Sequence, residues 1–125
     1  MSSLFRARTE INKIARDWRL WSEAIAKAAE KVLGPCQLHV FGSVAEGHAT
    51  GGSDVDLLIV ADHLPENPRA RSDLKAKIEE AANLPLYHPF EIHLATNKEA
   101  ESNPIYRKVI NKETALALRT SEKQI

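Results

Sequence analysis

The chain has 125 residues, 43% of them hydrophobic, and its 17 basic residues balance its 17 acidic residues. This length predicts one domain with one modest core, and a net charge of zero argues against the broad basic surface of a template-directed polymerase. The single cysteine, Cys36, cannot form an internal disulfide. No run is long enough to span a membrane and the N-terminus lacks an apolar signal core, so we expect a cytoplasmic protein.

An apolar stripe runs along residues 1–33, where we predict one long N-terminal helix that ends at Gly34-Pro35. The members of the stripe recur at heptad positions: Leu4, Ala7, Ile11, Ile14, Trp18, Trp21, Ile25, Ala28 and Val32. We expect residues 14–33 to pack over a sheet. For the first two turns, packing within the chain competes with pairing to a partner or to a second copy, which would make a homo-oligomer.

Two short apolar runs, Leu38–Phe41 and Val55–Val60, are predicted strands. The segment between them holds four of the five glycines. Gly42 leaves room for a phosphate to approach the backbone, and Ser43 is a favourable N-cap for a following helical turn. The N–H groups behind such a cap form an anion site, so the turn is a candidate phosphate-binding element.

Two aspartates open the second of these strands. Because side chains alternate along a strand, Asp54 and Asp56 are predicted to share one face while Val55 faces the other way. Mg²⁺ prefers oxygen ligands and often takes one or two carboxylates together with substrate phosphates. Taken singly, a Gly-Ser turn or an Asp-x-Asp is also typical of an ordinary loop or a solvated strand end. Together, they indicate a nucleotide and metal site.

The rest of the chain predicts a helix over 69–83 and then a half-buried strand, Phe90–Ala95, whose polar face carries Glu91 and His93. Glu91 is the only acid of that strand. His93 is either a packed histidine or a group that contacts phosphate or assists proton transfer. The C-terminal expectations are a capped helix at Asn97–Ser102, a helix opened by Pro104, an edge strand or helix at Thr114–Leu118, and a disordered tail over 121–125.

This order of elements predicts an α/β (α+β) fold with a small mixed β-sheet and helices mainly on one face. The expected single domain, 1–125, comprises the N-terminal helix at 1–33, a catalytic core at 36–96 and a C-terminal segment at 97–125. The site is expected on the open side, near the ends of the second and third strands.

Gly42-Ser43, ten further residues and then Asp54-Val55-Asp56 resemble the signature of the DNA polymerase β-like nucleotidyltransferase superfamily. At this length the chain most resembles its minimal nucleotidyltransferases, with the likeness covering about residues 36 to 96. The resemblance implies ATP as substrate and two Mg²⁺ ions. The metal-binding and catalytic residues that it implies are Asp54, Asp56 and Glu91, and the nucleotide-binding residues are Gly42, Ser43 and Ser53. Many members carry Asp where Glu91 stands, and Glu is one methylene longer.

The resemblance also suggests a partner. Minimal nucleotidyltransferases are often paired with a small helical HEPN protein in toxin–antitoxin modules, where the transferase is the antitoxin and attaches AMP to a tyrosine of the toxin. Three interpretations of the chain therefore stay open. It is a protein adenylyltransferase of this kind, a nucleotidyltransferase for a small-molecule alcohol, or a non-catalytic module that binds nucleotide or a partner.

Overall fold

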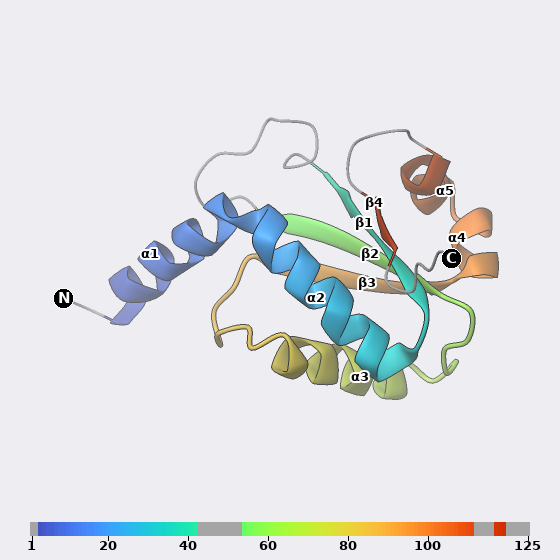
Figure 1. Cartoon of the computed structure of the whole chain (residues 1–125), viewed down its shortest axis with the longest axis horizontal. Coiled ribbons are helices and arrows are strands. Elements are labelled where there is room, and N and C mark those ends of the chain that lie inside the picture. The colour runs from blue at the N-terminus through green and yellow to red at the C-terminus, as the bar shows by residue number, and fades with distance from the viewer. Residues whose placement is uncertain (1–2, 43–53, 112–116, 120–125) are drawn as a thin grey trace, which may run out of the picture.

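The computed structural model describes residues 3–42, 54–111 and 117–119 (Figure 1). Four strands form one sheet in the order β3-β2-β1-β4. Their bounds are β1, Cys36–Phe41; β2, Val55–Ala61; β3, Phe90–Thr96; and β4, Ala117–Arg119. Strand β1 runs antiparallel to β2 and β4, whereas β2 and β3 are parallel. The predicted mixed sheet is thus confirmed.

The two long helices α2, Trp18–Leu33, and α3, Pro68–Ala81, cover one face of the sheet (Figure 1). Alternate residues of each strand point into the core beneath them because side chains alternate along a strand. The largest side chains that are fully buried there are Ile25, Leu38, Val55, Leu57, Ile59 and Ile78. This core anchors β2 and β3, so it sets the backbone positions from which side chains on their opposite face project.

The opposite face carries a smaller core. Leu58, Val60 and Ala95 pack there against Ala100 and the apolar side of the last helix. The two helices concerned are short: α4, Asn97–Ser102, and α5, Pro104–Asn111. The helices therefore lie mainly on the first face, as predicted. No helix in the described ranges has the length and apolar character needed to cross a membrane.

The single N-terminal helix predicted over 1–33 is wrong, because two helices occupy this segment. Helix α1, Ser3–Arg16, ends before Asp17, whose backbone angles of φ −98° and ψ 31° lie outside the helical range, and α2 begins at Trp18. Aspartate favours such a helix boundary because it is a weak helix former. The apolar stripe continues across the break, so periodicity did not reveal it. Figure 1 shows α1 projecting beyond the sheet, with Ile14 buried at its base.

The C-terminal elements follow local capping signals. Thr96 and Glu99 form a capping box at the start of α4, in which each side chain bonds the other residue's backbone N–H. Of the two alternatives for Thr114–Leu118, the strand is correct where the structure describes the chain, since Ala117–Arg119 pairs with β1 as an edge strand. The remainder of that segment, and the tail predicted to be disordered, lie outside the described residues.

Candidate metal and nucleotide site

Asp56 and Glu91 are direct partners across the parallel strands β2 and β3. Parallel neighbours in register place their side chains on the same face, here the one opposite α2 and α3. Val55 and Leu57, which flank Asp56, are fully buried on the other face. The Asp56 side chain is 26% exposed and Glu91 is exposed, so this pair of carboxylates is open to a ligand.

His93 joins these two acids. It lies two residues beyond Glu91 on β3 and therefore on the same face. Asp56, Glu91 and His93 each offer one ligand atom, and these atoms all lie within 4.8 Å of one another. Nε2 of His93 lies 3.5 Å from Oδ1 of Asp56. Carboxylate oxygens and an imidazole nitrogen are ligands for a divalent cation, so these three residues form a candidate metal site.

Gly42 closes one side of this site. It directly follows β1, and its φ of +84° lies in the region that favours glycine. A Cβ atom built on Gly42 would lie 2.5 Å from Oδ2 of Asp56. The backbone angle and the close approach both require glycine here. The end of β1 thus lies directly against the Asp56 carboxylate.

The structure brings together some of the residues selected from the sequence but not all. Asp56, Glu91 and Gly42 meet as described above. Asp54 immediately precedes β2 and is exposed, outside the group formed by Asp56, Glu91 and His93. Ser43 and Ser53 lie outside the described residues. Their parts in binding nucleotide, and that of Asp54 in binding metal, stay predictions.

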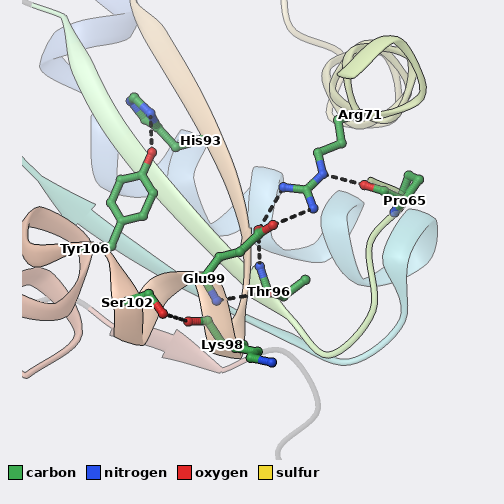
Figure 2. Close-up of polar contacts among 8 residues, drawn as sticks. All are labelled: Pro65, Arg71, His93, Thr96, Lys98, Glu99, Ser102 and Tyr106. Carbon is green, nitrogen blue, oxygen red and sulfur yellow. Dashed lines mark hydrogen bonds and ion pairs between the residues drawn. The ribbon is translucent and has the colours of Figure 1, made fainter. Parts of the chain in front are cut away.

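Two aromatic residues that sequence reasoning did not connect with the site surround His93. The Tyr106 hydroxyl, from α5, lies 3.2 Å from Nδ1 of His93 (Figure 2), and the Phe41 ring centroid lies 5.3 Å from that of the imidazole. Burial raises the pKa of Tyr106, and the negative charges of Glu91 and Glu99 raise that pKa further. No local pattern links Tyr106 to His93, because only tertiary packing brings α5 against β3.

The nucleotidyltransferase domain family model matches residues 22–116 of this chain. The match covers most of the sequence, including both strands that carry Asp56 and Glu91. The chain therefore belongs to the nucleotidyltransferase domain family, which confirms the resemblance drawn from the Gly-Ser and Asp-x-Asp pattern.

One solved structure agrees with this assignment, and a second is more distant. One crystal structure of a proposed nucleotidyltransferase shares 28% sequence identity with the chain, covers 78% of it and 94% of its own length, and superposes with a TM-score of 0.53. A second, a proposed nucleotidyltransferase from Sulfolobus solfataricus at 1.40 Å resolution, shares 18% identity over 83% of each chain, with a TM-score of 0.48. This second structure is too distant from the chain to bear on its function. No curated protein matches the chain significantly.

Proposed function

We propose that this nucleotidyltransferase uses ATP and Mg²⁺ to transfer AMP to a hydroxyl group, and that the acceptor is a tyrosine of a partner HEPN toxin, for which it serves as the antitoxin. The observation that carries the transfer is the pairing of Asp56 with Glu91 on one face of β2 and β3, beside Gly42. The nature of the acceptor rests on the resemblance to minimal nucleotidyltransferases and on the openness of the site.

The donor set fits a bound divalent ion. Asp56 and Glu91 supply the oxygen ligands that Mg²⁺ prefers, and the missing side chain of Gly42 leaves room for the half-buried Asp56 carboxylate. Nε2 of His93 is buried and has no hydrogen-bond partner, which is the state expected of a group that awaits a ligand. Ions at such a site lower the pKa of an acceptor hydroxyl and stabilise charge on phosphate oxygens.

The protein's own groups account for positioning and proton transfer. The acceptor oxygen attacks the α-phosphorus in line, forming the new ester bond, while the bond from that phosphorus to the bridging oxygen breaks and pyrophosphate leaves. The exposed Glu91 carboxylate is available to receive the hydroxyl proton. The strand pairing sets the backbone position of Asp56 and Gly42 leaves room for its carboxylate, so Asp56 is placed to orient the reacting groups.

The surroundings of Glu91 support a protein as the acceptor. The connection that leads into β3 carries two exposed apolar side chains, Leu86 at 87% and Tyr87 at 57% exposure. Both lie within five residues of Glu91 in the sequence. Exposed apolar groups of this size are typical of protein contact surfaces, and a protein docked there would bring its own hydroxyl to an open site.

The test is to incubate the protein with ATP, Mg²⁺ and the product of its adjacent gene, as the candidate partner, and to measure the mass of that product. We expect the partner to gain one or more AMP units on tyrosine. Asp56→Asn should prevent the gain. Asp73→Asn is the control, because Asp73 is an exposed residue of α3, and it should not prevent the gain. Transfer to a free alcohol with an unmodified partner would favour the small-molecule transferase. Tight partner binding without modification of any acceptor would favour the binding module.

A further inference from the structure

His93 is held by Tyr106 with one ring nitrogen facing the acids. Its side chain is 27% exposed, yet Nε2 itself is shielded from solvent and makes no hydrogen bond. That nitrogen lies 3.5 Å from Oδ1 of Asp56, within the group that includes Glu91. The other nitrogen, Nδ1, lies 3.2 Å from the Tyr106 hydroxyl (Figure 2).

Metal ligation through Nε2 requires one particular tautomer of the imidazole. A neutral histidine carries a proton on one ring nitrogen and a lone pair on the other. If Nδ1–H donates to the oxygen of Tyr106, the lone pair is on Nε2 and faces the carboxylates. A buried lone pair beside two acids is unfavourable without a partner. A cation bound between His93, Asp56 and Glu91 satisfies all three groups at once.

We propose that Nε2 of His93 is a metal ligand together with Asp56 and Glu91, and that Tyr106 is a positioning residue that fixes the ring through Nδ1. This inference rests on the proposed function, because it concerns the ion shared by Asp56 and Glu91. It gives that ion a different chemistry. A nitrogen ligand suits a transition-metal ion such as Zn²⁺ or Co²⁺, whereas Mg²⁺ prefers oxygen ligands. The nitrogen ligand should therefore raise the affinity of the shared position for a transition-metal ion, while its two carboxylates still accommodate the Mg²⁺ of the proposed function.

The role of Tyr106 follows from the way metal-binding histidines are held in proteins. Such a histidine almost always donates its second ring N–H to an outer partner, which sets the tautomer and the ring orientation. Phe41 packs beside the His93 ring from β1, and Tyr106 meets its edge from α5, with ring centroids 6.0 Å apart. The ring therefore has packing neighbours on two elements besides its own strand.

Nuclear magnetic resonance of the full chain with ¹⁵N-labelled histidine tests the ligand directly. Without metal, His93 should show the tautomer protonated at Nδ1. Addition of Zn²⁺ should move the Nε2 resonance of His93 and leave that of His63, which is exposed in the connection after β2, unchanged. His93→Gln assigns the signal. An Nε2-protonated tautomer, or an Nε2 resonance unmoved at saturating Zn²⁺, would overturn the proposal.

Calorimetry with Zn²⁺ and Mg²⁺ tests the positioning residue. Tyr106→Phe should weaken Zn²⁺ binding by about 10- to 100-fold, as loss of an outer partner does. Tyr87→Phe, which removes a hydroxyl from an exposed ring, should leave it unchanged. His93→Gln should weaken Zn²⁺ binding more than Mg²⁺ binding. Equal effects on both ions would overturn the assignment.

The two proposals fail separately. AMP transfer supported by Mg²⁺, with an Nε2 resonance that Zn²⁺ does not move, would leave the proposed function standing and overturn the role of His93. A shifted Nε2 resonance without modification of any acceptor would establish the ligand and count against the transferase.

Discussion

Gly42 leaves no space for a side chain beside Asp56, because a Cβ atom on Gly42 would lie 2.5 Å from Oδ2 of that carboxylate. The same residue has a φ of +84°, a conformation that L-residues rarely adopt. One glycine thus follows β1 directly and leaves the space that the Asp56 carboxylate occupies. The backbone turn and the candidate metal site depend on the same position.

Replacing Gly42 by alanine should disturb both. The left-handed backbone should cost about 1 to 2 kcal/mol of stability, and the new methyl group should displace the Asp56 carboxylate and weaken divalent-metal binding. Gly34→Ala is the matched control, since Gly34 has the same φ of +84° but nothing within 4 Å of the added Cβ. Urea unfolding and metal calorimetry measure the two effects. Equal loss of metal binding in both variants would show that contact with Asp56 is not the cause.

The charge of Glu91 should matter for turnover more than for folding. Glu91→Gln keeps the shape of an exposed side chain, so stability should change by less than about 0.5 kcal/mol. Nucleotidyl transfer should fall by about 10²- to 10⁴-fold if Glu91 accepts the hydroxyl proton, while ATP–Mg²⁺ binding is retained. Glu101 is an exposed acid on α4, and the control variant Glu101→Gln should keep the wild-type activity. If Glu91→Gln transferred nucleotide at the wild-type rate, the third carboxylate of the site, besides Asp54 and Asp56, would have to be another residue.

Helix α2 should contribute stability through one side only. Ile25 is completely buried between α2 and the sheet, so Ile25→Ala should lower the free energy of unfolding by about 2 to 5 kcal/mol. Leu20, on the same helix, is 69% exposed, so Leu20→Ala should change the free energy of unfolding by less than about 0.5 kcal/mol. Chemical denaturation compares the two. Similar losses would mean that Leu20 is covered in solution, as by a second copy.

The ion pair of Arg71 with Glu99 should make stability depend on acid pH. Two bonds of 2.9 and 3.0 Å join the guanidinium to the carboxylate (Figure 2). They are the main reason why the pKa of Glu99 lies below its usual 4.5. A carboxylate whose pKa is lowered by folding stabilises the protein at pH values above its unfolded-state pKa. This stabilisation is lost as the pH falls through the folded-state pKa.

Glu99→Gln measures this contribution. The variant keeps a side chain able to complete the capping box but loses the charge. The wild type should be more stable near neutral pH by less than about 1 kcal/mol, because the Glu99 side chain is 47% exposed. The gap should narrow as the pH falls below 4.5. A gap that does not change with pH would show that the charge contributes nothing.

Local patterns in the sequence were sufficient for most elements and for part of the site. Short apolar runs predicted β1 and β2. Alternation predicted β3 and placed Glu91 and His93 on one polar face, because side-chain direction in a strand depends only on neighbours in the chain. The glycine-rich turn and the spaced aspartates indicated the family because they too are local features: a phosphate- and metal-binding turn is built from residues close together in the sequence. The capped helix at Asn97–Ser102 is likewise a short-range feature.

Tertiary structure decided the contacts between elements. Alternation does not state which residue of β3 faces Asp56; the parallel register does, and it selects Glu91. The break at Asp17 lies within an unbroken apolar stripe, so periodicity could not mark it. Tyr106 meets His93 because α5 packs back against the sheet. Such contacts depend on how apolar faces bury one another, which is a property of the whole chain and not of any segment.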